Sequence, residues 1–506
     1  MPSSFTDSIT AGYPASDSSL LLGAASHEGR VHPELPIAIP LRTLNRHGLV
    51  AGATGTGKTK TLQHIAESLS AKGVPVLIMD MKGDISGISQ PGVEDERIAA
   101  RAKSIGMQWQ PSASPVEFMT ISEEPGVRMR ATISEFGPIL LAKMLELNET
   151  QESIISLVFK FADDHKLPLC DIKDMQKLLI FLSNEGKQLL ADGYGAVSTA
   201  SIGIILRKML ELQGQGAERF FSEPSFEVRD LLRTDASGKG YINILRLTDI
   251  QNRPGMFSTF VLSLVAEIFQ KFPEVGDLPQ PKLVIMIDEA HLVFRTATKT
   301  LLRELETVIK LIRSKGVGII FCTQLPTDIP PVILSQLGLK IQFALRAFTA
   351  IDRKAIKLVS QNYPDTAFYQ TEDLITRLGI GEALVTALDV RGTPTPLVHT
   401  LMAPPTSRMG TITDSELQSS LSSSTLVAKY EKTIDSESAH EILTKKFAAA
   451  AGGDSAPAEQ GSLADMLGSL LGKNMGSVAR TATNTVVRNV TSQIMRSVLG
   501  TIMGRN

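Results

Sequence analysis

Short apolar runs alternate with helical patterns along the middle of the chain. The runs predict buried strands at residues 48–52, 74–80, 240–247, 283–288, 316–323 and 340–346. Their nearly continuous apolar character is typical of parallel strands that are covered on both faces. After the first strand, apolar positions at three-and-four spacing predict a helix over 59–72, which Gly73 ends. Alternating strands and helices favour an α/β fold with a twisted, mostly parallel sheet.

The segments outside this alternating pattern differ in composition. Residues 1–47 mix short apolar runs with Gly and Pro, which predicts a small N-terminal β cap. Residues 130–232 have Leu, Ile, Glu and Lys at helical spacing and predict a helical insertion. We therefore expect the order 1–47 cap, 48–129 first part of the core, 130–232 insertion, 233–405 second part of the core, 406–447 C-terminal extension, 448–461 flexible linker and 462–506 basic amphipathic tail.

The first loop of the core has a sequence suited to phosphate binding. GATGTGKT matches G-x-x-x-x-G-K-[ST] and lies between a predicted strand and a predicted helix. Its glycines let backbone N–H groups surround phosphates, Lys58 neutralises the charge of the β- and γ-phosphates, and the Thr59 hydroxyl can bind Mg²⁺. A chance glycine-rich turn is the alternative, but the position between strand and helix argues against it. The predicted phosphate-binding residues are Gly52, Ala53, Thr54, Gly55, Thr56, Gly57, Lys58 and Thr59.

Two acids end the predicted strand at 283–288. In LVIMIDEAH, Asp288 falls at the carboxyl end of the strand, where it can hold Mg²⁺ through water beside the phosphate loop. Glu289 can then act as the general base that polarises an attacking water. A strand that ends in a solvated acidic turn is the alternative. Together with the complete phosphate loop, the pair favours hydrolysis over transfer of the phosphoryl group to another substrate.

Two further polar residues are candidates for the catalytic site. Gln324 follows the strand at 316–323, so its amide can bond both the attacking water and the γ-phosphate, although many strands simply end in polar residues. Arg313 lies just before that strand, at the end of a helix, where helix capping or solubility is the plainer explanation.

Two other groups stay open on the sequence alone. MDMKGD places Asp80, Lys82 and Asp84 after the strand at 74–80, at the edge where the candidate site lies, but ordinary loop polarity explains them equally well. His47 precedes the first strand and could touch a nucleotide, although one basic residue near a loop is a weak signal.

Composition narrows the class of protein. With 43% hydrophobic and 21% charged residues among 506, a large core is possible and global disorder is excluded. Lys and Arg number 51 against 53 Asp and Glu, so no overall basic field attracts nucleic acid, and any DNA contact must be local. Cys170 and Cys322 are too few for a disulfide framework, which favours a reducing compartment. With no basic leader and no apolar run of membrane-spanning length, we expect a soluble, cytoplasmic protein.

The motifs together resemble a known family. The likeness is to the YjgR-type bacterial ATPases, in the HerA/FtsK branch of P-loop motor proteins, and runs from about Leu20 to Glu441. It rests on NRHGLVAGATGTGKTKTLQ, VPVLIMDMKGDISG, LVIMIDEAHLVF, LIRSKGVGIIFCTQLPTDIP, SQLGLKIQFALRAFT and GEALVTALDVRGTP. The resemblance implies a P-loop NTPase fold that is RecA-like, of the additional-strand catalytic-Glu type. It also implies ring assembly, usually hexameric, and DNA translocation as the typical activity.

The resemblance also assigns roles by motif position. It implies that Lys58 and Thr59 bind phosphate and Mg²⁺, that Asp288 and Glu289 form the hydrolytic pair, and that Gln324 is the sensor. Arg313 matches the arginine that precedes the sensor strand in the family (RSKG in this chain), which implies action on the ATP of a neighbouring subunit.

Two functions of different classes follow. The first is an ATP-hydrolysing, Mg²⁺-dependent oligomeric motor that acts on double-stranded DNA. The second is a nucleotide-regulated switch or scaffold ATPase that binds a protein partner through its helical insertion. A GTPase is disfavoured because the sequence has no N-K-x-D signature, and a small-molecule kinase is disfavoured by Glu289.

The tail at 462–506 is basic and patterned. It has no acidic residue after Asp465, and apolar residues at three-and-four spacing give one helical stripe. Such a helix can lie on anionic lipid, bind DNA phosphates, or pack against the core or another subunit, the last being the plainest reading. We expect the tail to be dispensable for ATP chemistry. Its basic residues are Lys473, Arg480, Arg488, Arg496 and Arg505.

Overall fold

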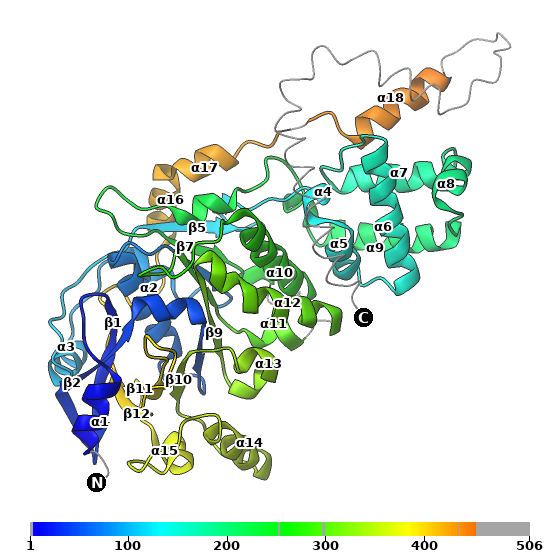
Figure 1. Cartoon of the computed structure of the whole chain (residues 1–506). Coiled ribbons are helices and arrows are strands. Elements are labelled where there is room, and N and C mark those ends of the chain that lie inside the picture. Colours follow the sequence, from blue (N-terminus) through cyan, green and yellow to red (C-terminus); the bar gives the residue numbers. More distant parts are fainter. Residues whose placement is uncertain (1–3, 251–253, 296–298, 435, 452–506) are drawn as a thin grey trace. The chain divides into compact units, whose positions relative to one another are not determined.

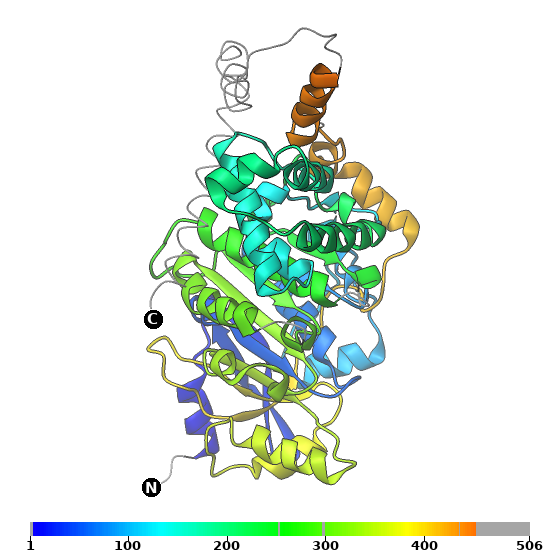
Figure 2. The same ribbon diagram turned by 90° about the vertical axis from the view of Figure 1, so that its right-hand side faces the viewer.

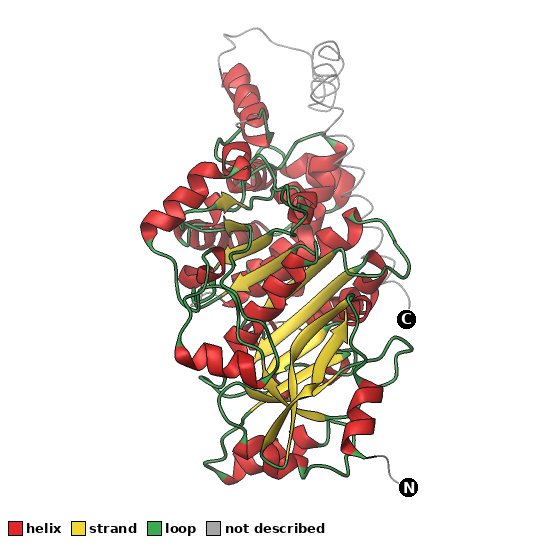
Figure 3. Cartoon of the chain, turned by 90° about the vertical axis from the view of Figure 1, so that its left-hand side faces the viewer, coloured by secondary structure: helices red, strands yellow, loops and turns green. Residues whose placement is uncertain are grey.

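One large sheet organises the main part of the molecule. The computed structural model describes residues 4–250, 254–295, 299–434 and 436–451. Within them, 12 strands lie in the order β2-β1-β12-β11-β10-β3-β9-β8-β4-β7-β5-β6, and Figure 3 shows them side by side in a twisted sheet. The strands are β1 Ser19–His27, β2 Arg30–Pro40, β3 Gly48–Ala51, β4 Val76–Asp80, β5 Val116–Thr120, β6 Val127–Arg128, β7 Ile242–Arg246, β8 Leu283–Ile287, β9 Val317–Thr323, β10 Leu339–Phe343, β11 Glu382–Thr386 and β12 Val398–Met402.

The centre of the sheet is parallel and its β1 side is antiparallel. Every pairing from β10 through β3, β9, β8, β4 and β7 to β5 is parallel. The pairings among β10, β11, β12, β1 and β2 are antiparallel. Strands β3, β4, β8 and β9 are buried along their whole length, as expected when both faces are covered. The predicted α/β fold is confirmed, and β9 lies between β3 and β8 as the additional strand that the resemblance implies.

Helices cover both faces of this sheet. Figure 1 shows α2 on one side and α10 and α12 on the other, the arrangement that right-handed crossovers require. Residues of α2 pack on the strands, with Leu62, Ile65 and Leu69 in one cluster with Val76 and Ile78 of β4. The helices of this unit are α1 Phe5–Gly12, α2 Lys58–Ala71, α3 Glu96–Ser104, α10 Pro254–Lys271, α11 His291–Arg295, α12 Lys299–Ile312, α13 Pro331–Leu334, α14 Ala350–Ser360, α15 Thr371–Arg377 and α16 Asp414–Ser423.

A second compact unit is helical. Its described part consists mainly of residues 128–226 and 428–451. Its helices gather into one group (Figures 1 and 2), with buried contacts between α7 and both α9 and α18. The helices are α4 Ile133–Phe136, α5 Pro138–Met144, α6 Glu149–Asp164, α7 Ile172–Ser183, α8 Lys187–Tyr194, α9 Thr199–Gly214 and α18 Ala439–Ala451, and α17 Thr425–Tyr430 crosses the boundary between the units.

The structure differs from the sequence expectations in three places. The hairpin β1–β2 joins the main sheet through β12, so residues 1–47 do not form a separate cap. Residues 227–232, predicted in the insertion, belong to the unit with the sheet. Helix α18 continues to Ala451, into the segment predicted as a linker from 448. The tail predicted at 462–506 lies outside the described residues.

Membrane-spanning length is not reached by any single helix in the described ranges. Helices α8 and α9 pass a test of length and composition only when taken together, and they are bent by 109° at the break between them.

Candidate functional site

Four parallel strands end at the same edge of the sheet, where the predicted residues gather. The order β3, β9, β8, β4 pairs Ala51 with Thr323, Phe321 with Ile287, and Ile287 with Met79. The loops after these strands are therefore neighbours. The glycine-rich loop follows β3, Gln324 follows β9, Asp288 and Glu289 follow β8, and Asp80 ends β4.

The glycine-rich loop needs backbone that only glycine supplies without strain. Gly52 has φ of 153°, and a Cβ there would lie 2.4 Å from the Cβ of Phe343. Gly57 has φ of 123° and approaches Gly381, whose N–H donates to the Thr56 carbonyl at 2.8 Å. The loop is thus held from outside by β10 and the turn before β11. Its N–H groups lead into the positive end of α2, an arrangement that suits an anion.

Lys58 is placed inside the loop. Its ammonium group donates to the carbonyls of Gly52 at 2.7 Å and Ala53 at 3.1 Å. Burial lowers its pKa from the usual value, against the opposing effect of Asp288 and Glu289. Thr59 follows in the first turn of α2 and is partly exposed. These positions agree with a cation and a hydroxyl that meet phosphates and a metal ion at the helix start.

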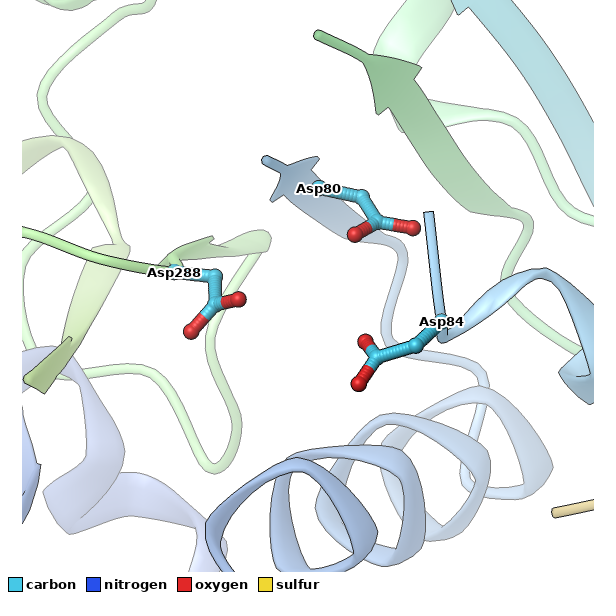
Figure 4. Close-up of side chains that lie close together, drawn as sticks. All are labelled: Asp80, Asp84 and Asp288. Carbon is cyan, nitrogen blue, oxygen red and sulfur yellow. The ribbon is translucent and has the colours of Figure 1, made fainter. Parts of the chain in front are cut away.

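Three aspartates converge beside the loop. Oxygens of Asp80, Asp84 and Asp288 all lie within 4.8 Å of one another, and Figure 4 shows the three side chains pointing into a shared space. Asp80 is fixed by the backbone N–H groups of Lys82 at 3.1 Å and Gly83 at 2.7 Å. Within the described residues, Oδ1 of Asp84 is buried without a hydrogen-bond partner. Clustered carboxylate oxygens with an unused acceptor are suited to a hard cation such as Mg²⁺.

The electrostatics of Asp80 and Asp288 also favour a bound cation. Burial, and then the neighbouring carboxylates, raises the pKa of Asp80 to about 6 although backbone N–H groups oppose the shift. Burial also raises the pKa of Asp288, which Lys82 partly offsets. When two acids with raised pKa values lie close together, a bound cation stabilises their charged forms.

Glu289 is strained and has a cationic neighbour. Its φ is 49°, unusual for a residue other than glycine. Its side chain is 10% exposed, and its Oε1 forms an ion pair with the ammonium group of Lys82. Its Oε2 lies 3.1 Å from Nδ1 of His291, but in the part of the chain that the structure describes neither atom has a partner with hydrogen-bond geometry.

The remaining candidates separate into two groups. Gln324 is exposed at the carboxyl edge, close to the loop as predicted. Arg313 is exposed in the turn Arg313–Lys315, before β9. Since β9 has 7 residues of about 3.3 Å each, Arg313 lies about 23 Å from the other end of the strand and outside the site of its own chain.

His47 is also remote from the loop, so the suggestion that it touches a nucleotide is wrong. Its ring is buried at the start of β3, where Nε2 donates to the Ile309 carbonyl at 2.8 Å and Nδ1 accepts from the Ile319 N–H at 3.0 Å. Burial lowers its pKa to about 4.

Some contacts in the site could not be predicted from the sequence. Asp80, Lys82 and Asp84 were visible in MDMKGD, but only the pairing of β4 with β8 brings them to Asp288 and Glu289. The Cys322 thiol lies beside the Asp288 carboxylate, and burial raises the pKa of the thiol well above its ordinary value. A cysteine inside an apolar strand gives no sequence signal for this contact.

Comparison with known proteins gives the family. The sequence profile described as helicase HerA-like C-terminal matches residues 26–506. The chain belongs to this family. It is also 22% identical over 355 residues to the DNA double-strand break repair helicase HerA of Sulfolobus acidocaldarius. That match covers 69% of this chain and 64% of the relative, so the chain spans less than two thirds of the relative's length.

Solved structures show the same fold at low identity. The bacterial conjugative coupling protein TrwBdeltaN70, in its unbound form, matches with a TM-score of 0.52 and 14% identity, over 80% of this chain and 94% of the other. The plasmid coupling protein TrwB in complex with ADP and Mg²⁺ matches with a TM-score of 0.50 and 14% identity, over 80% and 95% of the two chains. At this identity the likeness concerns the fold.

Proposed function

We propose that this protein is an ATPase that uses Mg²⁺. The observation that carries the proposal is the convergence, at one sheet edge, of the glycine-rich loop with Lys58 and the buried acids Asp288 and Glu289. The loop and α2 offer N–H groups and positive charge to phosphates. Directly after β8, Glu289 follows Asp288, so a candidate general base lies next to a candidate metal ligand. TrwB, which shares the fold, has been solved with ADP and Mg²⁺.

The residues present fit a magnesium ion. Thr59 and Asp288 would hold it, with Asp80 and Asp84 close enough to bind its waters. The ion would neutralise charge on the β- and γ-phosphates.

Hydrolysis then depends on the side chains around the γ-phosphate. Lys58, now bonded to the carbonyls of Gly52 and Ala53, would turn its protons to the phosphate oxygens. Glu289 would accept the proton of the attacking water, and Gln324 would orient that water from β9.

Motor activity on DNA is the second part of the proposal. Membership of the HerA-like family, and the DNA double-strand break repair helicase HerA as a relative, support double-stranded DNA as the substrate. By analogy with the family that the motifs resemble, the working form would be a homo-oligomeric, hexameric ring. Arg313 lies too far from its own site to act there, so any role in hydrolysis would be on the ATP of a neighbouring subunit. The compact helical unit supports the alternative, a switch or scaffold that binds a protein partner.

The deciding experiment is ATP hydrolysis with and without double-stranded DNA across a salt series. A motor should be stimulated by DNA, and the stimulation should fall steeply with salt because phosphate contacts release counterions. Lys58→Ala is the negative control, since it removes the charge that faces the phosphates. Slow hydrolysis that DNA does not change would favour the scaffold, and absence of ATP binding by the wild type would overturn the proposal.

A further inference from the structure

Lys82 occupies the loop between two of the clustered acids and reaches across to the next strand. The loop follows β4, and β4 pairs with β8 so that Met79 lies beside Ile287. This pairing places Lys82 next to the end of β8, where its ammonium group forms the ion pair with Oε1 of Glu289. The contact therefore joins the candidate general base to a residue that no part of the proposed chemistry uses.

The ion pair occupies the atom that the proposed reaction needs. A general base must present a carboxylate oxygen to the water whose proton it accepts. Oε1 of Glu289 is taken by Lys82, and Oε2 is buried beside Nδ1 of His291. In this arrangement the ammonium group of Lys82 occupies Oε1, and burial keeps water from Oε2.

Of the two side chains in the ion pair, that of Lys82 is the one that can move away. The Glu289 side chain is 10% exposed and its backbone is fixed at φ 49°, whereas the Lys82 side chain is 37% exposed on a flexible four-carbon stem. Gly83, with φ of 76°, follows Lys82 directly. Lys82 can therefore leave without disturbing β8, while Glu289 cannot.

We propose that Lys82 is a positioning residue that restrains Glu289, and that each turnover requires the Lys82–Glu289 pair to open. The inference rests on the proposed ATPase function and adds a control on its general base. Burial lowers the pKa of Lys58, and repulsion by the nearby Lys82 lowers it further. A phosphate group near Lys58 would offer Lys82 another anion and so favour release of Glu289.

The test compares steady-state ATP hydrolysis by the full chain and by variants at position 82. Lys82→Met keeps the length of the side chain and removes the charge, so kcat should rise about fivefold, the size expected for a partly exposed ion pair, while KM stays within about twofold. Lys82→Arg retains a cation that reaches Glu289 and should raise kcat much less. The double variant Lys82→Met/Glu289→Gln should lose the gain, because the gain requires a working base.

A matched control separates this effect from general loss of an ion pair. Lys271→Met removes the pair with Glu267 on α10 and should leave kcat unchanged. An unchanged or lower kcat in Lys82→Met would overturn the inference while leaving the ATPase proposal intact. A gain that persists in the double variant would overturn it as well, since the gain would not pass through Glu289. Absence of hydrolysis in both the wild type and Lys82→Met would overturn the ATPase proposal and the inference together.

Discussion

At the scale of single residues, the site concentrates charge where water is scarce. Asp80 and Asp288 are 0% and 2% exposed, and Asp80 is oriented by the N–H groups of the loop that follows it. Donors that are already in place cost no reorganisation when charge develops in a reaction. Burial raises the pKa of both acids, and a bound cation would stabilise their charged forms.

Glu289→Gln tests the general base directly. The amide has the shape of the carboxylate but cannot accept the proton of water, so ATP binding should persist while kcat falls by about 10²- to 10⁴-fold. Binding is measured by calorimetry and turnover by phosphate release. Glu274→Gln, at an exposed carboxylate that pairs with Lys315, is the control and should keep both properties. A kcat within a few-fold of the wild type would remove Glu289 from this role.

His47 should make stability depend on pH. Its pKa is lowered to about 4 in the fold from an ordinary 6.5, so the unfolded chain binds the proton first as pH falls. The contribution is fully present above pH 6.5 and is lost as pH falls from 6.5 through about 4, by about 3 kcal/mol in all. His47→Asn, which tolerates the φ of 61°, should be less stable at pH 7 and should lack this part of the slope. Denaturant unfolding of both proteins at several pH values measures the difference, and equal slopes would contradict the assignment.

At the scale of elements, the sequence predicts those strands that are continuous apolar runs. The strands β3, β4, β7, β8 and β9 fall within the predicted segments, and β10 begins one residue before its segment, because buried parallel strands are largely apolar. The strands β11 and β12 are missed because Glu382, His399 and Thr400 interrupt their patterns, and both pair antiparallel on the side of the sheet beyond β10. The glycine-rich loop is local in sequence and was found; the Asp80–Asp84–Asp288 cluster depends on strand order and was not.

The glycine-rich loop offers a matched pair of substitutions. Gly52→Ala places a Cβ 2.4 Å from Phe343 at a φ that disfavours any side chain, so the loop or β10 must shift. We expect a loss of about 2–4 kcal/mol in unfolding free energy and loss of ATP binding. Gly55→Ala has φ of 78° but, among the described residues, meets no atom within 4 Å. It should cost about 1 kcal/mol. Similar thermal unfolding of the two variants would refute the role assigned to Phe343.

At the scale of the whole molecule, the chain divides into a sheet unit and a helical unit, each with its own buried core. Two parts of the chain that are distant in sequence form the helical unit, residues 128–226 and the segment from 428 onward. Sequence periodicity predicted the first of these parts. It did not predict that α18 returns to pack on α7, because the hydrogen bonds from Ser438 and His440 to Asp174 join residues that are far apart in the sequence.

Asp174 should therefore stabilise the helical unit without affecting ATP binding by the sheet unit. Its fully buried carboxylate accepts from the N–H groups of Cys170 at 2.7 Å, Asp171 at 3.0 Å and His440 at 2.8 Å, and from the Ser438 hydroxyl. Asp174→Ala leaves these donors without their acceptor, which should cost the helical unit about 3 kcal/mol and free α18 for proteolysis. ATP affinity should stay within about twofold of the wild type. Asp192→Ala, at an exposed position of α8 where the carboxylate accepts from the side-chain amide of Gln188, is the control and should resist the protease. Parallel loss of ATP binding in a folded Asp174→Ala protein would show that the helical unit supports the nucleotide site, contrary to this expectation.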